Sequence, residues 1–379
     1  MKILHLSDLH LGKRVNEFSM LEEQEFILNE LLEIIDKEKP QVVIIAGDVY
    51  DKSVPPTEAV RLFDDFLCSL SRLGLQVFVI SGNHDSAERI SFGGRIMSSS
   101  GIHMSQVYSG KIEPVQLYDE YGSLNVYMLP FIKPIYVKRF HGDAEIKSYT
   151  DALRIVVEEM NVDTQYRNIL IAHQFVTGAS FSQSEEFSVG GTDNVDASVF
   201  EEFDYVALGH IHRPQNIGNG KMRYCGTLLK YSLSEVNQEK SVTIVEIGEK
   251  GNVNVRLLPI APKRDMREYK GTFARLSDKA FYSNINTDDY IFITLTDEAD
   301  IPDAVRKLRK IYPHMMKLSY DNSRTRSRSE IKNDSFAEKL PPEQLFERFY
   351  EQQNNHSMSE EQLGFVRELI KEVWEEELS

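Results

Sequence analysis

The stretch MKILHLSDLHLGK (residues 1–13) passes from an apolar run directly into side chains that can bind metal ions. Residues 3–6 are predicted to form a buried strand, and Asp8 and His10 follow just beyond its end. Residues two apart in an extended segment point to the same side, so both side chains can reach one ion. This opening stretch therefore predicts a strand whose carboxyl end carries part of a metal site.

The same combination of an apolar strand and metal-binding side chains recurs along the chain. Strands are predicted at residues 42–46, 77–81, 169–172 and 205–208, some of them β-branched runs typical of strands buried on both faces. Because the carboxyl ends of parallel strands meet at one edge of a sheet, we expect one shared site there. Glycine precedes three of the ligand groups and frees the backbone to turn sharply off the sheet. The side chains expected at this edge are Asp8, His10, Asp48, Asn83, His84, His173, His210 and His212.

The residue types indicate which metals fit. Carboxylate, amide and imidazole ligands without a thiolate suit manganese, iron or zinc better than calcium or magnesium. Eight ligands exceed what one ion needs, which favours two ions about 3.5–4 Å apart that share a carboxylate, for which we choose Asp48. A lone histidine after a strand is more often a surface residue or a satisfied core residue than a ligand, so His173 owes its assignment to its place in the ordered set.

The order of the predicted elements indicates the fold class. Amphipathic helices are predicted at residues 20–37 and 57–73, between the first three strands, and Cys68 is expected in the core on the apolar face of the second helix. Further strands are predicted at residues 126–130, 242–247 and 255–259. A βαβ beginning followed by a β-rich half favours an α/β (α+β) fold, a two-sheet β-sandwich flanked by helices.

Composition shifts divide the chain into four predicted segments. They are a metal-binding domain (1–262), a small α+β capping domain (263–322), a linker (323–340) and a helical tail (341–379). Within the capping domain, residues 271–276 and 290–295 are predicted as strands and residues 301–311 as a helix. The tail is predicted to form two short helices, the second starting with a Ser359–Gln362 capping box and carrying an apolar stripe between Leu363 and Trp374.

Composition excludes several classes of protein. The 379-residue chain is 41% hydrophobic and 27% charged, which is typical of a globular protein, and no apolar run is long enough to span a membrane. Two distant cysteines argue against a disulfide framework and favour a reducing, cytoplasmic location. The net charge of −16 does not predict a nucleic-acid partner, but residues 341–379 hold ten acidic and three basic residues and account for much of it.

Five motifs together resemble the ordered signature of the calcineurin-like metallophosphoesterases: D-x-H, G-D-x-x-D, G-N-H-D, a lone histidine and G-H-x-H. Within that superfamily the chain resembles the bacterial SbcD nuclease subunits. The resemblance rests on HLSDLHLGK (5–13), AGDVYD (46–51), SGNHDS (81–86), AHQFVTGA (172–179), ALGHIHRPQ (207–215) and YCGTLLKYSLSEVNQEKSV (224–242), and it extends over almost the whole chain. It implies the metallophosphoesterase fold with a DNA-recognising capping domain.

This resemblance also implies roles for single residues. One ion would be held by Asp8, His10, Asp48 and His212, and the other by Asp48, Asn83, His173 and His210. His84 would then not be a ligand but would face the scissile phosphate, with Asp51 orienting it. The nucleophile would be a hydroxide generated at two divalent ions, with Mn²⁺ as the expected metal.

The implied function is a metal-dependent DNA nuclease, a single-strand endonuclease and 3′→5′ double-strand exonuclease that processes ends, hairpins and breaks in DNA repair, recombination and replication. The implied partners are DNA and an SbcC-like coiled-coil ATPase that docks on the tail, in a heterotetramer built on a homodimer associated with the nucleoid. A phosphatase or cyclic-nucleotide phosphodiesterase with the same metal core is the alternative, although it would not need the roughly 120 residues after the catalytic domain. A non-enzymatic scaffold that tethers DNA ends is the third hypothesis, which His84 argues against.

Basic residues in loops near the catalytic strands are the hypothetical contacts to the DNA backbone, namely Lys13, Arg14, Arg89 and Lys133. Arg324, Arg326 and Arg328 could also grip phosphate, but we interpret them as part of a solvated linker. Asp85 is expected to stabilise the turn after His84.

Overall fold

The computed structural model of the protein describes residues 1–142, 144–180, 193–218, 220–325, 346–347, 350 and 357–376, with the main chain alone at 361 and 371–376. The chain divides into two compact units, Met1–Met266 and Arg267–Ser379, which we describe separately. Among the described residues, no helix has the length and apolar character needed to cross a bilayer.

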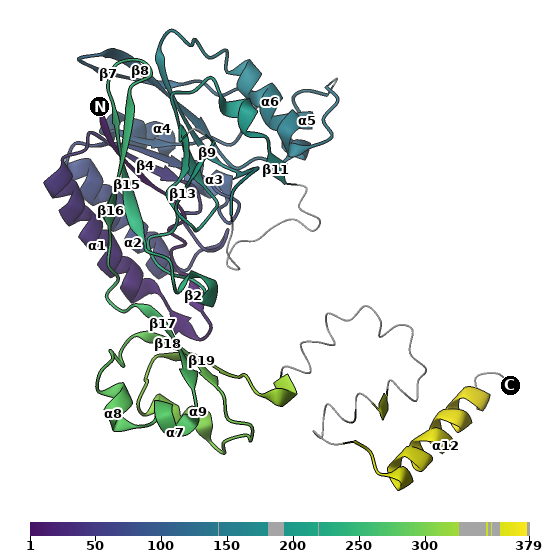
Figure 1. Ribbon diagram of the computed structural model, residues 1–379. Coiled ribbons are helices and arrows are strands. Elements are labelled where there is room, and N and C mark those ends of the chain that lie inside the picture. Colours follow the sequence, from purple (N-terminus) through teal and green to yellow (C-terminus); the bar gives the residue numbers. More distant parts are fainter. Residues whose placement is uncertain are drawn as a thin grey trace. The chain divides into compact units, whose positions relative to one another are not determined.

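Two six-stranded sheets form the first unit (Figure 1). The first sheet has the order β16 (Val253–Pro259), β15 (Ser241–Ile247), β1 (Lys2–Leu6), β4 (Val42–Ala46), β5 (Gln76–Ile80) and β6 (Ile102–Met104). The second has the order β13 (Gln215–Ile217), β14 (Met222–Tyr224), β12 (Tyr205–Gly209), β9 (Arg167–His173), β8 (Gly122–Leu129) and β7 (Val115–Asp119). The central strands β1, β4, β5, β8, β9 and β12 are parallel to their neighbours within this group. The carboxyl ends of several parallel strands therefore meet at one rim of each sheet.

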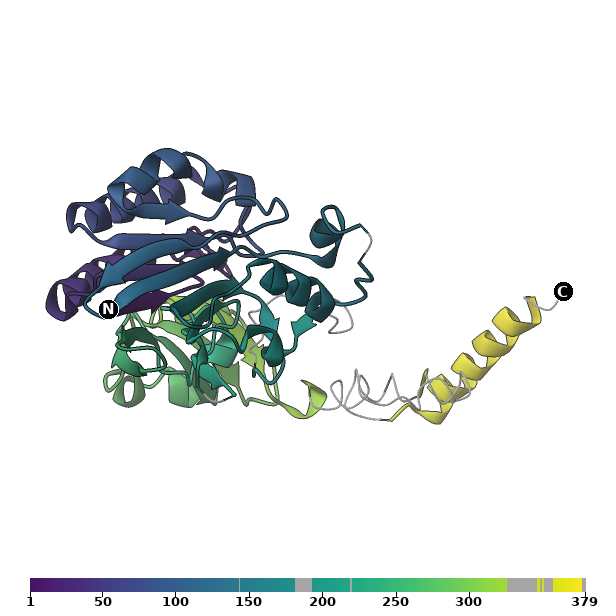
Figure 2. The same ribbon diagram turned by 90° about the horizontal axis from the view of Figure 1, so that it is seen from above.

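The sheets pack face to face, as the apolar runs predict. Ile44 of β4 and Phe78 of β5 are fully buried in one cluster with Ile171 of β9 and Ala207 of β12, and this cluster fills the space between the layers. Helices α1 (Leu21–Glu38) and α2 (Thr57–Arg72) lie side by side on the outer side of the first sheet (Figures 1 and 2). The predicted α/β (α+β) sandwich flanked by helices is confirmed.

Helix α6 (Tyr149–Glu159) covers the other face of the second sheet. Leu153 and Val156 on its buried face pack with Leu170 of β9 and Val206 of β12. Its start is fixed by a capping box, in which the Ser148 side chain and the Asp151 side chain each accept the other's main-chain N–H. Shorter elements connect the layers: β2 (Arg14–Val15), β3 (Phe18–Ser19), α3 (Ala87–Ser91), α4 (Gly94–Met97), α5 (Pro134–Lys138), β10 (Phe175–Val176) and β11 (Asn194–Val195).

One expectation about α2 is wrong. Cys68 is exposed, not in the core. The buried face of α2 carries Phe63, Phe66, Leu67 and Leu70. Position 68 follows Leu67 by about 100° around the helix axis, which turns its side chain away from that face.

The second unit has its own core. A three-stranded sheet of β17 (Met266–Gly271), β18 (Tyr290–Leu295) and β19 (Met315–Tyr320) packs with the helices α7 (Phe273–Leu276), α8 (Lys279–Tyr282) and α9 (Ala304–Arg309). The strand predicted at 271–276 is wrong, because β17 ends at Gly271 and α7 follows. Thr272 starts that helix, since its hydroxyl accepts the Arg275 main-chain N–H at 3.3 Å.

The end of the chain is described in part. Arg324 pairs with Asp300 at 2.7 Å and Ser323 bonds to Glu298 at 2.5 Å, so the start of the predicted linker is joined to the second unit. Helix α12 (Glu360–Glu376) begins with the predicted capping box, in which Ser359 and Gln362 exchange hydrogen bonds of 2.9 and 3.2 Å. Arg326, Arg328, most of the predicted linker and most of the first tail helix lie outside the described residues.

Candidate metal centre

All eight side chains predicted at the sheet edge lie together in the first unit. Asp8 and His10 follow β1, Asp48 follows β4, and Asn83 and His84 follow β5, so the first sheet contributes five of them. His173 is the last residue of β9, and His210 and His212 follow β12 of the second sheet. The site therefore spans the rims of both sheets.

The first group of side chains gathers around His10. Its Nε2 lies 3.1 Å from Nε2 of His212 and 3.7 Å from Oδ2 of Asp48. Ligand atoms of Asp8, His10 and His212 all lie within 4.8 Å of one another. These distances allow one ion to be held by the four side chains.

The second group gathers around Asn83. Its Oδ1 lies 3.0 Å from Nε2 of His173 and 2.9 Å from Nδ1 of His210. Nε2 of His173 is in turn 3.4 Å from Oδ2 of Asp48, the same oxygen that faces His10. Asp48 thus contacts both groups, as a bridging carboxylate must.

The donor chemistry of these side chains fits divalent cations. Nδ1 of His173 is 2.8 Å from the Ala46 carbonyl oxygen, so in the neutral ring it donates there and leaves a lone pair on Nε2. That lone pair faces the oxygens of Asn83 and Asp48, which are also electron donors. Asp8 and Asp48 are almost completely buried, and burying two carboxylates is costly without a cation to compensate them.

The pKa of His173 responds to the same two buried carboxylates. Burial alone would lower the pKa of His173, but the carboxylates of Asp48 and Asp8 outweigh it and raise this pKa to about 9. At the neighbouring His210, burial and the charge of His173 outweigh the attraction of Asp48 and lower the pKa to about 3. The two carboxylates therefore favour a positive charge beside Nε2 of His173, and a metal ion can take the place of the His173 proton there.

The backbone is strained at four of the predicted ligands. Asp8, His10, Asp48 and His210 have φ angles of 53°, 45°, 48° and 100°, in the left-handed region that non-glycine residues rarely adopt. Hydrogen bonds hold them there: the His10 N–H donates to the Asp48 carbonyl and the His210 N–H to the Asp8 carboxylate, both at 3.0 Å. Strain of about 1–3 kcal/mol per residue is typical of functional sites.

The glycines beside the ligands have two different roles. Gly47 has a φ of 86°, which agrees with the predicted sharp turn. At Gly82 and Gly209 the need is space, because an added Cβ would lie 2.1 Å from Oδ1 of Asp48 or 1.9 Å from the Ala46 carbonyl oxygen. These two glycines let the strands approach closely enough for the ligands to meet.

His84 lies at the edge of the cluster and is partly exposed. Its Nδ1 is 3.0 Å from the main-chain oxygen of Asp51, and its Nε2 is 3.9 Å from Oδ2 of Asp48. The Asp51 contact that we expected therefore comes from the main chain. The Asp51 carboxylate instead accepts from Nζ of Lys13 at 2.6 Å and lies 3.7 Å from Nδ1 of His10.

Asp85 ties the two loops of the first sheet together. Its carboxylate accepts three main-chain N–H groups, from Val49 at 3.1 Å and from Tyr50 and Gly82 at 2.9 Å. Burial, followed by the charge of Asp48, raises the pKa of Asp85 to about 6. The turn-stabilising role expected for Asp85 agrees with these contacts.

Sequence reasoning missed the charged pair behind His212. Glu235 is fully buried, with Oε1 3.7 Å from Nδ1 of His212 and Oε2 2.6 Å from Nζ of Lys240. Both residues fall in the segment 224–242, which resembles the nuclease subunits. That resemblance was the available sign that the segment matters, but their spacing in the sequence does not predict a contact with His212. Such a partner orients a metal-binding imidazole and fixes which nitrogen faces the ion.

Family comparison agrees with this geometry. Residues 1–214, more than half of the chain, match the calcineurin-like phosphoesterase family. The chain belongs to the calcineurin-like phosphoesterases. Residues 262–354 match a second family, described as the type 5 capsule protein repressor C-terminal domain.

Relatives of this phosphoesterase include a nuclease component. The chain is 32% identical to the SbcD subunit of the SbcCD nuclease of Staphylococcus epidermidis over 384 aligned positions, which cover 100% of both chains. A dimetal phosphatase from Danio rerio is 11% identical, with a TM-score of 0.42 and coverage of 68% of this chain and 95% of that one. The family resemblance inferred from the five motifs is confirmed, and with it the enzyme class, a metal-dependent phosphodiesterase and nuclease.

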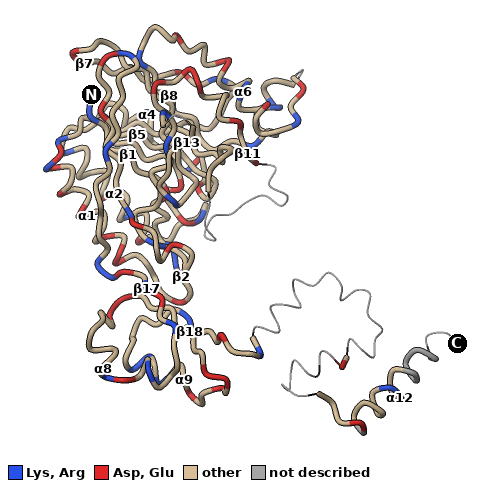
Figure 3. Tube along the Cα trace, viewed as in Figure 1, with Lys and Arg blue, Asp and Glu red and all other residues tan. Residues whose placement is uncertain are grey.

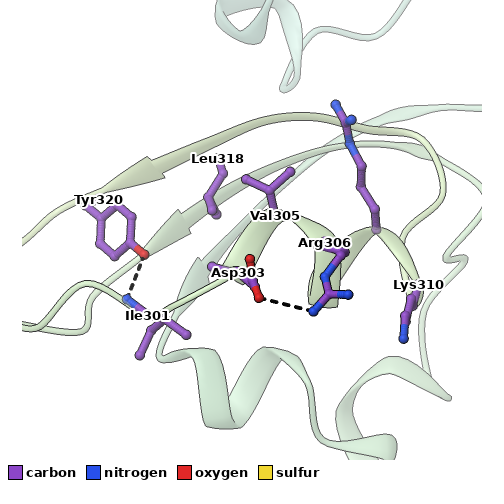
Figure 4. A pocket seen from close by; sticks show the side chains of 9 residues that line it. Ile301, Asp303, Val305, Arg306, Lys310, Leu318 and Tyr320 are labelled. Atoms are coloured by element: carbon purple, nitrogen blue, oxygen red, sulfur yellow. Dashed lines mark hydrogen bonds and ion pairs between the residues drawn. The ribbon is translucent and has the colours of Figure 1, made fainter.

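The second unit of this phosphoesterase contains a separate pocket of about 680 Å³ along α9 and β19 (Figure 4). Its lining includes Val305, Leu318 and Tyr320, and the Tyr320 hydroxyl accepts the Ile301 N–H at 3.2 Å. Arg306 pairs with Asp303 at 3.1 Å across the helix start. The basic residues of α9 are drawn in blue in Figure 3. None of the predicted metal ligands lines this pocket.

Proposed function

We propose that this chain is the nuclease subunit of an SbcCD-type complex. It would cut single-stranded DNA as an endonuclease and degrade duplex ends as a 3′→5′ exonuclease, with DNA ends, hairpins and breaks as substrates. The observation that carries this proposal is the cluster of buried ligand side chains in a chain that matches a nuclease subunit over its full length.

Two divalent ions, Mn²⁺ in our proposal, would occupy the two groups of side chains. Asp8, His10, Asp48 and His212 would hold one, and Asp48, Asn83, His173 and His210 the other. Such ions lower the pKa of bound water and neutralise charge on the phosphate. The protein holds the ligands in place through the strained loops and the Glu235–His212 contact.

His84 would assist departure of the leaving oxygen. Its Nδ1 is engaged by the Asp51 carbonyl, so the proton available to a substrate is the one on Nε2. That nitrogen lies 3.9 Å from Oδ2 of Asp48, so it faces the predicted metal ligands. A group of this kind acts as a general acid or stabilises charge that builds on the phosphate.

The test is to replace His84 by glutamine. We expect His84→Gln to reduce cleavage of oligonucleotides by about 10²–10⁴-fold, the usual contribution of a general acid, while calorimetric metal binding persists. His103→Gln is the matched control, because among the described residues the His103 side chain bonds only to Gln76 and stacks on Phe78, away from the predicted ligands. Wild-type cleavage by His84→Gln would refute the role of His84.

The alternative functions are separated by substrate. The purified protein with Mn²⁺ should cut oligonucleotides. Hydrolysis of bis(p-nitrophenyl) phosphate without any oligonucleotide cleavage, even with the ATPase partner present, would favour the phosphatase or cyclic-nucleotide phosphodiesterase. No hydrolysis of either substrate, with metal still bound, would favour the scaffold.

We propose that the tail, residues 341–379, docks on an SbcC-like coiled-coil ATPase. On α12, Phe365 is 63% exposed and Leu369 is 43% exposed, and residues four apart lie on one face of a helix. Phe365→Asp combined with Leu369→Asp should abolish co-purification with the ATPase, whereas Glu368→Ala should retain it. Deletion of 341–379 should break the complex and spare metal-dependent cleavage.

We propose that two copies associate through the short helices after β5. Phe92 between α3 and α4 is 82% exposed and Ile96 of α4 is 79% exposed, the highest exposed fractions among the large apolar side chains that the structure describes. Exposed apolar patches mark interaction surfaces. Phe92→Glu with Ile96→Glu should convert a dimer to a monomer in sedimentation experiments. Leu257→Glu, at another exposed apolar position on β16, is the control. A monomeric wild-type protein at micromolar concentration would refute this interface.

We also propose that the enzyme works in the cytoplasm with nucleoid DNA. Cys68 and Cys225 are both free thiols, which agrees with a reducing compartment.

A further inference from the structure

A cavity of about 580 Å³ opens beside the metal centre, between the loop after β5 and helix α5. Asn83, one of the predicted metal ligands, is part of its wall. Phe131 forms another part, and its ring lies edge-on to His173, with 6.3 Å between the ring centroids. The cavity therefore continues directly from the place where a phosphodiester would be cleaved.

Aromatic rings dominate the outer part of this cavity. Tyr136 and Phe140 both line it and are 39% and 49% exposed. Phe140 is braced edge-on against Tyr108 at 5.6 Å, and Tyr108 is itself held by hydrogen bonds to Gly110 and His141. Exposed aromatic rings on a braced support provide flat apolar faces without a large entropic cost of ordering.

Two cationic side chains of the cavity can contact an anionic ligand. Lys133 has no ion-pair partner within the part of the chain that the structure describes, and Arg139 lies 5.7 Å from the centre of the Tyr136 ring. The two acidic residues of the lining are already engaged, Asp85 by three main-chain N–H groups and Glu88 by the Ser86 hydroxyl at 2.8 Å. Two cations beside aromatic faces are the combination that binds a phosphate joined to a base.

We propose that this cavity binds the unstacked base of a nucleotide that flanks the scissile phosphate. Its volume is within the range of about 300–1,000 Å³ typical of small-molecule sites, enough for one nucleoside but too small for a base pair stacked in a duplex. Because every base has a flat face, the site accepts any sequence, yet it requires a base that has left the helix. The inference rests on the proposed nuclease function and adds to it a physical reason to prefer unpaired ends.

The experiment uses the full chain with Mn²⁺ and a single-stranded oligonucleotide that is cut at one position. An abasic residue is placed on either side of the scissile phosphate in turn. We expect one of these substrates to lose about 5- to 150-fold in kcat/KM, the range that stacking of one base contributes. Tyr136→Ala combined with Phe140→Ala should bring the ratio of kcat/KM for the normal substrate to kcat/KM for the sensitive abasic substrate near one. Tyr136→Phe should leave this ratio as in the wild type.

Binding is measured separately with the His84→Gln protein, by fluorescence anisotropy of the normal and the abasic oligonucleotides. Tyr118→Ala is the matched control, because Tyr118 is 70% exposed on β7 and does not line the cavity. Equal cleavage and equal binding of the normal and both abasic substrates would overturn the inference while the nuclease function stands. Hydrolysis of bis(p-nitrophenyl) phosphate without any oligonucleotide cleavage would instead overturn the nuclease function itself.

Discussion

Lys240→Met is expected to destabilise the first unit by removing one half of a buried ion pair. The Lys240 ammonium bonds to Glu235 at 2.6 Å, to Thr227 at 2.7 Å and to the His212 carbonyl at 3.1 Å. Glu235 is 0% and Lys240 is 5% exposed, so water does not screen the pair. Without the ammonium, the carboxylate remains buried with only weaker polar contacts.

The expected cost is about 3–5 kcal/mol, the usual loss when one partner of a buried pair is removed. For a domain of this size, each kcal/mol lowers Tm by roughly 2–4 °C, so a shift of roughly 6–20 °C is expected. Urea denaturation followed by circular dichroism measures the change in free energy of unfolding. The double variant Glu235→Gln with Lys240→Met has no buried charge and should recover most of the loss.

The pH dependence has a defined sign. Burial would raise the pKa of Glu235, but the Lys240 ammonium outweighs it and holds the pKa well below the usual value of 4.5. A carboxyl with a lowered folded-state pKa stabilises the protein above pH 4.5 and loses this contribution as the pH falls below it. The stability difference between wild type and Lys240→Met should therefore narrow below pH 4.5. A cost under about 1 kcal/mol, or a double variant no more stable than the single, would refute the reasoning.

Three further predictions concern the metal centre and its supports. Gly209→Ala places a Cβ 1.9 Å from the Ala46 carbonyl oxygen, so it should lower Tm and weaken metal binding measured by calorimetry. Gly142→Ala is the control and should do neither, because the nearest neighbour of its added Cβ would be 4.0 Å away. Tyr224→Phe should lower the free energy of unfolding by about 1–3 kcal/mol in urea denaturation. The buried hydroxyl accepts the Val176 N–H at 2.8 Å and donates to the Gln174 carbonyl at 2.7 Å, and an unchanged denaturation midpoint would contradict this. Removal of metal by EDTA should lower Tm relative to protein in excess Mn²⁺. Free Mn²⁺ at 100 times its Kd would stabilise the folded protein by about 2.7 kcal/mol, and an unchanged Tm would argue against tight binding.

Much of the fold and of the site follows from local patterns. Strand β4 agrees with the predicted bounds, residues 42–46, because a continuous β-branched run has few other stable conformations in a buried sheet. The polar residues directly after such strands were expected to meet, since parallel strands deliver their carboxyl ends to one edge. The failure at 271–276 has an equally local cause, because the Thr272 cap competes with the alternating pattern.

The contacts behind the ligands did not follow from local patterns. Glu235 and Lys240 stand in a polar segment that looks like a solvated loop, and only the fold buries them against His212. Likewise, Gly82 and Gly209 looked like turn residues, but they are needed because strands far apart in sequence approach within contact distance. The base-sized cavity combines residues from the loop after β5, the segment after β8 and α5, which no spacing relates.

The sequence alone predicted the opening strand, the two candidate metal ligands after it and the family to which the chain belongs. These features depend on residue type and order, which are local. The tertiary structure decided that Asp48 faces both groups of ligands, that the Asp51 main chain contacts His84, and that a buried charged pair stands behind His212. Those contacts depend on how two sheets pack face to face. Packing brings together residues about 200 positions apart, and no local sequence pattern predicts which of them will meet.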